Sequence, residues 1–354
     1  MTQEQLAEIL SISPQAVSRW ETDAAMPDIS MLPAICNLFD VSADELLGIG
    51  IENKERKILE TSEKAGSFSR RGYNEEAKEI LEAGLREFPN SYKLMNDLVH
   101  VYYNLRSSNG DGEGEDYQKK ALELGNRILE SCTVDSFRYS ATQILCFIHK
   151  DNGDFDKAKE LANNMPSMAV SRESLLAIVT QGEEQLTRKR IALKRYLELF
   201  SAGLNNLNTR LDNGEWTFTD GETALLRDKR IAIVDVMFED GDFGFFHTHL
   251  CATHQDQAKY YAKIKDEEKT VYHLSKAAEH AISFVTAEKD REHTSLFLRG
   301  RKIGGFSTNN SDNDALWLLS ELGEPCFDFV RDNGDFVKVK EVLKKYAQKW
   351  QVET

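Results

Sequence analysis

Proline is scarce and unevenly distributed in this chain, which contains six prolines among 354 residues. This share is about 1.7%, against a usual share of about 5%. No proline occurs between Pro166 and Pro325, where the sequence is rich in Leu, Ala, Glu and Lys. Because folds with many short strands need frequent turn residues, such a stretch favours helices. The sequence therefore predicts an all-α fold.

The composition excludes several classes of protein. Charged residues make up 29% of the chain and aromatic residues 9%, which leaves enough apolar material for a folded core. No apolar run approaches the roughly 18 residues that a membrane span requires. The sequence after Met1 has no secretory signal pattern. A net charge of −15 argues against a chain that binds nucleic acid over its whole surface, while it leaves room for one small local site.

The cysteines and histidines predict neither disulfides nor a metal site. The five cysteines are odd in number, widely spaced and never in a CxxC pair, which favours reduced thiols in the cytoplasm. His247, Cys251 and His254 would share one helix face and could supply three zinc ligands. No fourth ligand is signalled nearby and phenylalanines flank the trio, so we expect an ordinary packed helix, no metal and no other cofactor. No P-loop, HExxH or GxSxG motif is present, and we do not expect an enzyme.

The first fifty residues begin with two helix start signals. Thr2 and Gln5 form a capping box, and Ser13 followed by Pro14 provides a cap and a first helical residue for a second helix. This second helix is predicted to end near Glu21, with its apolar residues facing inward. Two short helices joined by a tight turn, the second with a short polar face, follow the helix-turn-helix plan. The outward-facing side chains of the second helix are Gln15, Ser18 and Arg19.

Two further helices are predicted before residue 50. The third spans residues 29–39; if Ser30 is its cap, Pro33 lies in its first turn, where proline costs little. Ser42 and Glu45 form a second capping box, which predicts a fourth helix.

These elements together resemble the lambda-repressor-like DNA-binding domain of the Cro/C1-type (XRE) helix-turn-helix regulators. The resemblance rests on TQEQLAEILSISPQAVSRWE and MPDISMLPAICNLFDVSADELLG, between residue 1 and about residue 48. It implies that residues near the first helix N-terminus hold phosphate and that the second helix faces the major groove of double-stranded DNA. Glutamine can pair there with adenine and arginine with guanine. The implied DNA-binding residues are Thr2, Gln3, Ser13, Pro14, Gln15, Ser18 and Arg19.

The N-terminal sequence departs from this family in two respects. The family fold has five helices, and its first, basic helix precedes the Thr-Gln pair, whereas here Met1 stands where the following loop would be. Residues 1–50 also contain eight acidic residues and one base, Arg19, a balance of −7 that suits a phosphate-binding surface poorly. We therefore expect the domain to lack its first helix in this chain. Either the true start lies upstream of Met1, the interpretation that we favour, or the domain is truncated.

A ten-residue motif occurs three times in the remaining sequence. It begins at Gly72, Gly153 and Gly334, and each copy is predicted to be a glycine turn that opens a helix. The copies resemble the second helices of tetratricopeptide (TPR) repeats, whose period is about 34 residues. In this frame Ala77 occupies the small-residue position and Pro89 the end of the repeat.

The rest of residues 51–354 is predicted to complete a TPR-like α-solenoid. A second repeat begins at Tyr92, and its turn is lengthened by the polar insert 107–115. Residues 171–240 fit the repeat poorly, but their helical periodicity predicts longer hairpins within the same array. Residues 300–314, rich in Gly, Ser and Asn, are predicted to form a loop before a final helical pair.

The array is the predicted sensor or dimerisation domain. Solenoid repeats form a concave groove from their first helices, and asparagine or glutamine can bind a peptide backbone there. A solvated groove without a ligand, or a purely dimerising surface, remains an alternative. The residues predicted to face the groove are Asn96, His100, Tyr103, Gln143, Lys150, Gln255 and Lys259.

Two functions are compatible with this organisation of domains at residues 1–50 and 51–354. The first is a cytoplasmic transcriptional regulator that binds an operator as a homodimer, senses a peptide or protein ligand and has no membrane partner. This organisation resembles a large class of Gram-positive regulators, some of which respond to short peptides. The second is a helical-repeat scaffold for a protein or peptide, in which the DNA-binding domain has decayed.

Overall fold

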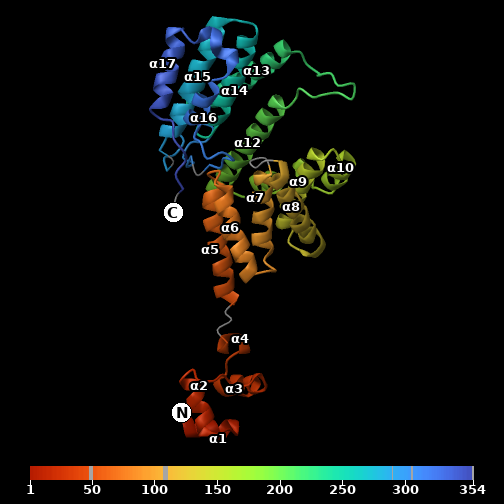
Figure 1. Cartoon of the computed structure of the whole chain (residues 1–354), viewed down its shortest axis with the longest axis vertical. Helices are drawn as coiled ribbons and strands as arrows, with labels where there is room; N and C mark the ends of the chain where they lie inside the picture. Colours follow the sequence, from red (N-terminus) through yellow and green to blue (C-terminus); the bar gives the residue numbers. More distant parts are fainter. Residues whose placement is uncertain (48–50, 107–110, 289, 304–305, 353–354) are drawn as a thin grey trace.

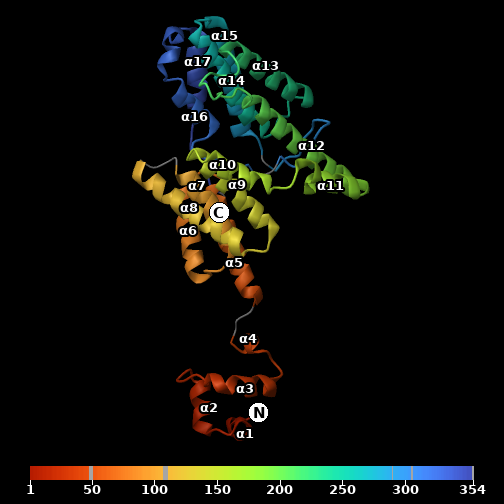
Figure 2. The ribbon, with the colours of Figure 1, turned by 90° about the vertical axis from the view of Figure 1, so that its right-hand side faces the viewer.

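The computed structural model describes residues 1–47, 51–106, 111–288, 290–303 and 306–352, and this part of the chain is predominantly helical. Within it β structure is limited to isolated bridges, so the predicted all-α fold is confirmed. Residues 1–47 lie apart from the helical array that follows (Figures 1 and 2). The predicted domain boundary falls at residues 48–50, outside the described residues. None of the described helices is both long and apolar enough to span a membrane.

The N-terminal part consists of four short helices and one 3-10 turn. The predicted capping boxes at Thr2 and Ser42 both form, and Ser13 caps the second helix with Pro14 in its first turn. A small core joins the helices through the buried side chains of Ala7, Leu10, Val17 and Ile35. The elements are α1 (Gln3–Leu10), α2 (Pro14–Glu21), η1 (Ile29–Met31), α3 (Leu32–Phe39) and α4 (Ala43–Leu46).

The third predicted helix begins later than its sequence pattern indicated. Asp28, rather than Ser30, provides the cap, since its carboxylate accepts a hydrogen bond from the Ser30 N–H at 2.8 Å and starts η1. The α-helix itself starts at Leu32, which leaves Pro33 in the first turn as predicted. Ile29 is 82% exposed, so the inward face of this segment is narrower than its apolar residues suggested.

The first six helices of the array form successive hairpins. Each helix contacts the next, and α5 also contacts α7 while α7 contacts α9, as expected where the first helices of TPR-like hairpins stack (Figure 1). Ala77 is fully buried at the predicted small-residue position, beside Leu94 and Leu98. The helices are α5 (Ile51–Ser69), α6 (Asn74–Glu87), α7 (Tyr92–Leu105), α8 (Asp111–Ser131), α9 (Asp135–Asp151) and α10 (Phe155–Asn163).

The polar insert predicted as an extended turn at residues 107–115 is partly helical. Residues 107–110 lie outside the described residues, but α8 already begins at Asp111. The segment continues directly into the packed part of α8, where Ala121 is fully buried. The polar composition suggested a turn, but the acidic residues of the insert also stabilise the first turns of a helix, so the prediction was wrong for the part that begins at Asp111.

The middle of the array contains two hairpins that differ from the repeat. The predicted helices form, but residues 206–219 reverse the chain without helical structure, and an antiparallel bridge joins Arg210 to Trp216. The turn of this longer hairpin forms there because asparagines and Gly214, with φ of +83°, favour a reversal of the chain. The elements are η2 (Met168–Val170), α11 (Arg172–Val179), α12 (Gly182–Asn205) and α13 (Asp220–Met237).

The C-terminal part packs a long hairpin against shorter elements. Its two long helices approach closely through buried small residues such as Ala258 and Ala277, while Phe327 fills the space beneath the shorter elements. The loop predicted at residues 300–314 precedes the shorter elements, the first of which, α16, begins at Asp314. The elements are α14 (Phe246–Lys263), α15 (Glu267–Thr286), α16 (Asp314–Glu321), η3 (Pro325–Val330) and α17 (Gly334–Lys344).

Two of the three motif copies contain the predicted glycine turn. Gly72 and Gly153 adopt φ angles of +79° and +78°, in the left-handed region that glycine favours. Gly334 instead lies within the first turn of α17, where Asn333 caps the helix. The prediction of a glycine turn was therefore wrong for the third copy, because the asparagine supplies the start signal one residue earlier.

The end of the array folds back on its beginning. Arg71, in the turn between α5 and α6, donates a hydrogen bond to the Phe306 carbonyl at 2.7 Å, and its guanidinium lies 4.0 Å from the centre of the Phe306 ring. Tyr73 donates a hydrogen bond from its hydroxyl to the Trp350 carbonyl at 3.0 Å. The segment after residue 300 and the C-terminal tail therefore connect the last helices to the first hairpin.

Candidate functional site

The helix α2 presents the side chains predicted to contact bases. Its position is fixed by Val17, which is 1% exposed, and by the Ser13 hydroxyl, which accepts a hydrogen bond from the Ala16 N–H at 3.3 Å. Gln15 and Arg19 lie on the exposed face. A fixed helix with a bidentate amide and a guanidinium on its open face is the arrangement that direct readout in the major groove requires. Pro14 is also exposed, whereas Ser18 is half-buried.

The two residues predicted to hold phosphate lie at the start of α1. The Thr2 hydroxyl caps the helix by accepting a hydrogen bond from the Gln5 N–H at 3.2 Å. The Gln3 side-chain amide donates to the carboxylate of Glu21 and so links the start of α1 to the end of α2. For Gln3 to contact a phosphate, its amide would have to break the hydrogen bond to Glu21 and donate to the phosphate instead.

Acidic groups remain charged on the surface of this domain. Hydrogen bonds from Ser30 lower the pKa of Asp28, and hydrogen bonds from Ser42 lower the pKa of Glu45. Both carboxylates are thus ionised at neutral pH. Arg19 is the one basic side chain among residues 1–50, so negative charge predominates in this segment. The charge balance makes α2, rather than a broad basic surface, the part of the domain best suited to DNA.

The predicted groove residues of the first part of the array do not all face solvent. Asn96 is 8% exposed, contrary to the prediction, because α7 is covered by its neighbouring helices. His100 contacts the Ser140 hydroxyl at 2.7 Å, and burial lowers the pKa of this histidine. Tyr103 is half-buried beneath the guanidinium of Arg106, 3.4 Å from the ring centre. The two exposed members of this group are Gln143 and Lys150.

The predicted groove residues of α14 lie in the other part of the array. Gln255 is 2% exposed and donates a hydrogen bond to Glu321 at 2.8 Å, so its predicted exposure was wrong. Lys259 is more accessible, and its ammonium forms ion pairs with Glu321 at 2.6 Å and Glu324 at 2.8 Å. The seven predicted residues therefore form two separate groups rather than one groove.

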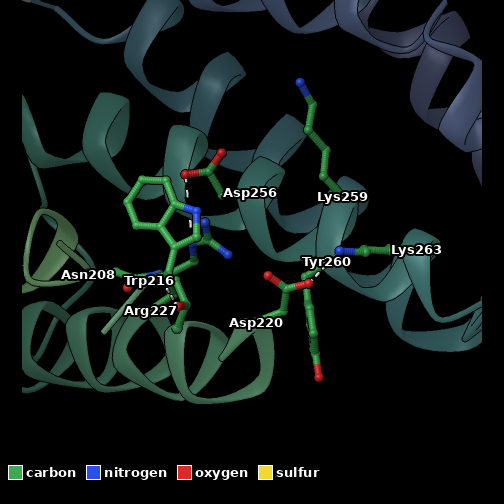
Figure 3. Close-up of a pocket in the computed structure, with 9 residues that line it drawn as sticks. Asn208, Trp216, Asp220, Arg227, Asp256, Lys259, Tyr260 and Lys263 are labelled. Carbon is green, nitrogen blue, oxygen red and sulfur yellow. Dashed lines mark hydrogen bonds and ion pairs between the residues drawn. The ribbon is translucent and has the colours of Figure 1, made fainter. Parts of the chain in front are cut away.

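Lys259 lines a pocket of about 430 Å³ beside the segment 206–219 (Figure 3). The indole of Trp216, 61% exposed, stands on one side of this pocket, with Lys259 and Lys263 on the other. Two ion pairs cross the floor: Lys263 with Asp220, and Arg227 with Asp256 at 3.8 Å. The volume falls within the usual range of small-ligand sites.

This pocket combines an aromatic ring with charges of both signs. Ammonium and guanidinium groups can bind a carboxylate, carboxylates can bind an amine, and an exposed indole can cover an apolar side chain. Sequence reasoning identified Lys259 alone in this set. The signal that it missed was Trp216, a single large aromatic residue in a segment rich in asparagine and glycine.

Two of the three histidines of α14 pair with histidines of α15. The Nδ1 atoms of His247 and His280 lie 2.9 Å apart, and so do those of His254 and His273. Cys251 is fully buried between these pairs along the helix, and burial raises the pKa of its thiol well above the usual value. Among the described residues no group of three or more potential ligands has the geometry to hold a metal ion.

The sequence alone could have indicated these pairs. His273 and His280 are seven residues apart, as are His247 and His254, so each helix places two histidines two turns apart on one face. Burial lowers the pKa of His254 to about 3 and that of His280 to about 4. The rings of His254 and His280 are therefore neutral at pH 7, so each can accept a hydrogen from its partner ring or donate one to it.

Comparison with known proteins identifies the N-terminal part. Residues 1–46 match the helix-turn-helix family model, and this segment is a helix-turn-helix domain. Over 47 residues the chain is 47% identical to the HTH-type transcriptional activator BcrR of Enterococcus faecalis. The aligned part is 13% of this chain and 23% of the relative, so the chain spans about a quarter of the length of this relative.

One solved structure aligns with a larger share of the chain. It is the crystal structure of Bacillus thuringiensis PlcR in complex with the peptide PapR7 and DNA. The alignment covers 79% of this chain and 89% of that chain, with 16% sequence identity and a TM-score of 0.33.

Proposed function

We propose that this chain is a DNA-binding transcriptional regulator of the cytoplasm. The observation that carries the proposal is the helix-turn-helix domain of residues 1–46, in which α2 holds Gln15 and Arg19 on an exposed face. Relatives of this segment include a transcriptional activator. All five cysteines are free thiols, as expected in a reducing compartment. The array of residues 51–354 then serves as the sensor and dimerisation domain.

In this function α2 lies in the major groove and reads base edges. Arg19 pairs with guanine and Gln15 with adenine, while Ser18 contacts the same groove. The start of α1 lies against a phosphate through Thr2 and Gln3, while Pro14 faces the major groove with the base-contacting residues and Ser13 lies beside it at the start of α2. A homodimer would place two such helices about 34–36 Å apart on a two-fold symmetric operator.

Arg19→Ala tests this arrangement directly. The variant should lose about 1–3 kcal/mol of discrimination at one base position, which is roughly 5- to 150-fold in relative affinity. The matched control is Arg56→Ala, which removes the same charge from an exposed position of α5 outside the domain. Mobility shifts of DNA taken from upstream of the gene, with single-base variants of the bound site, measure both effects.

The regulator proposal fails if the full chain binds DNA only in a salt-sensitive and sequence-indifferent manner. It also fails if Arg19→Ala and Arg56→Ala change base preference equally, because a general loss of charge would then explain both. Absence of any shift at low salt favours the alternative function, a helical scaffold for a protein or peptide. The balance of −7 in residues 1–50 and the bond between Gln3 and Glu21 are the observations that favour this alternative.

We further propose that the array binds a short peptide in the pocket at Lys259. The indole of Trp216 supplies an apolar contact, and the ion pairs of the floor can exchange for the charged groups of a peptide. Screening of synthetic hexapeptides by thermal shift would detect binding, and Trp216→Ala should abolish it. Leu211→Ala is the control, since Leu211 is exposed in the same segment but does not line the pocket. Equal loss in both variants, or no stabilising peptide, contradicts this site.

A further inference from the structure

A second pocket in the array has an unusual charge for this acidic protein. It lies between the hairpin α11–α12 and the segment 291–302, and its volume is about 320 Å³. Six basic side chains and two glutamates line it, which gives a formal charge of +4, whereas the whole chain carries −15. The basic residues are Arg172, Arg190, Lys194, Arg195, Arg301 and Lys302.

The two glutamates neutralise only part of this charge. Glu198 contacts Arg195 at 3.0 Å and Lys194 at 3.8 Å, and Glu173 contacts Arg172 at 2.9 Å. Hydrogen bonding to Arg172, with a smaller contribution from Arg195, lowers the pKa of Glu173. This carboxylate is therefore ionised and paired with Arg172.

Three cations of the pocket have no such partner. Within the part of the chain that the structure describes, no carboxylate lies within 4.0 Å of Arg190, Arg301 or Lys302. Burial lowers the pKa of His293, which also lines the pocket, so this ring adds no charge at pH 7. Like charges that converge on a partly enclosed space repel one another, because the effective dielectric constant there is below that of water.

We propose that this pocket binds a small phosphorylated molecule through a group with two or more negative charges. A diphosphate group would pair with the three cations that lack carboxylate partners and would relieve their mutual repulsion. The guanidinium groups of Arg190 and Arg301 come from opposite walls, α12 and the segment 291–302, so they can hold phosphate oxygens from two sides. The volume admits a ligand the size of a mononucleotide more readily than a macromolecule.

Occupation of this pocket would connect distant parts of the array. Phe306 follows the segment 291–302 by four residues in the sequence, and its carbonyl accepts the hydrogen bond from Arg71 in the turn between α5 and α6. A ligand that ties this segment to α12 would therefore stabilise the junction between the middle of the array and its first hairpin. Such a ligand site is separate from the pocket at Lys259 and from the DNA-binding surface.

The experiment is a titration of the full chain with inorganic pyrophosphate and with ATP, followed by calorimetry and by the shift in Tm. Binding to the folded state should raise Tm progressively, with the logarithm of the ligand concentration once that concentration exceeds Kd. Arg190→Ala combined with Arg301→Ala should weaken the affinity at least about tenfold. The matched control is Lys189→Ala combined with Arg299→Ala, which removes two charges from the same helix and the same segment outside the pocket.

The comparison of pyrophosphate with ATP shows which part of the ligand is recognised, and the comparison of the two double variants tests whether this pocket binds it. Binding of pyrophosphate shows that the diphosphate group suffices, and binding of ATP alone shows that a nucleoside is required; either supports the site if the pocket variant loses it and the control does not. The proposal is overturned if neither ligand binds at millimolar concentration or if both double variants weaken binding equally. Binding of duplex DNA, but of neither small ligand, at this pocket would also overturn it. None of these outcomes depends on whether α2 recognises an operator.

Discussion

Two turns of this protein share a sequence motif and a backbone conformation but differ in their surroundings. Gly72 and Gly153 each open a helix with φ near +79°. An added Cβ at Gly72 would lie 2.4 Å from the carbonyl carbon of Asn310, whereas nothing lies within 4 Å of a Cβ at Gly153. The local sequence thus determines the turn, while a segment more than two hundred residues away determines how tightly the turn is enclosed.

The helices that follow these turns show the same contrast. In α6, Ala77 and Leu81 are fully buried between α5 and α7. In α10, which contacts α9 alone among the described helices with substantial packing, no residue is buried. The motif therefore specifies a helix, and burial depends on whether further helices cover it. The hairpin α14–α15 is a third case, because buried alanines and paired histidines both lie between its two helices.

The largest expected effect is at the buried copy of the motif. Leu81→Ala removes a fully buried side chain and should cost about 2–5 kcal/mol of unfolding free energy through lost burial and the cavity that remains. Urea unfolding measures this loss. Leu59→Ala, at a position 53% exposed in the neighbouring helix, should cost less than about 0.5 kcal/mol. Similar losses for the two variants would contradict the packing of α6 between its neighbours.

The next effect concerns the enclosed turn. Gly72→Ala combines left-handed backbone strain with a clash against the backbone of Asn310 and should cost about 2–4 kcal/mol. Thermal unfolding is the measurement. A cost no greater than that of the same substitution at the open turn would show that the segment near Asn310 does not pack against the first hairpin.

The paired histidines should make the hairpin α14–α15 sensitive to acid. Burial depresses the folded-state pKa of His254 and His280 to about 3 and about 4, below the usual 6.5. The unfolded chain therefore binds more protons between about pH 4 and 6.5, and stability falls as the pH drops through this window. His254→Gln with His280→Gln should reduce this fall by about 1–2 kcal/mol.

Thermal unfolding at pH 6.5, 5.5 and 4.5 measures the dependence. His149→Gln is the control, because His149 lies in α9, away from the paired histidines. The same pH dependence in the wild type and in both variants would show that carboxylates, rather than these histidines, dominate acid unfolding.

The smallest effect is expected at the open turn. Gly153→Ala meets no neighbouring atom, so only the left-handed conformation opposes it, at a net cost of about 1 kcal/mol after the reduced entropy of the unfolded chain is included. The difference between Gly72→Ala and Gly153→Ala in Tm isolates the contribution of the distant segment. A larger loss at Gly153 would reverse the comparison.

Much of the N-terminal domain could be predicted from its sequence, because its information is local. Capping boxes at Thr2 and Ser42, and the Ser13–Pro14 start of α2, depend on residues within one turn of each other. The sequence left the cap of the third helical segment open, because Asp28 and Ser30 are both good caps and only the folded backbone shows that Asp28 accepts the hydrogen bond. The base-contacting residues of α2 stay predictions that a DNA-binding experiment must test.

The groove and the pockets could not be predicted in the same way. Periodicity indicated which residues of α14 share a face, but not that α16 covers Gln255 or that Glu321 and Glu324 approach Lys259. The basic pocket combines side chains from α12 with Arg301, more than one hundred residues further along. Three of its cations belong to a basic run at residues 188–195, but no local window of the sequence shows that Arg301 and Lys302 approach that run.

The sequence by itself determined that this protein is helical, where most of its helices begin, and that a helix-turn-helix domain stands at its N-terminus. These properties depend on proline scarcity, caps and turn residues, whose energies act between near neighbours in the chain. The tertiary structure alone decided which equivalent positions are buried, how the end of the array meets its first hairpin, and where charges gather in pockets. Those properties arise from contacts between distant segments, which a repeated motif does not encode.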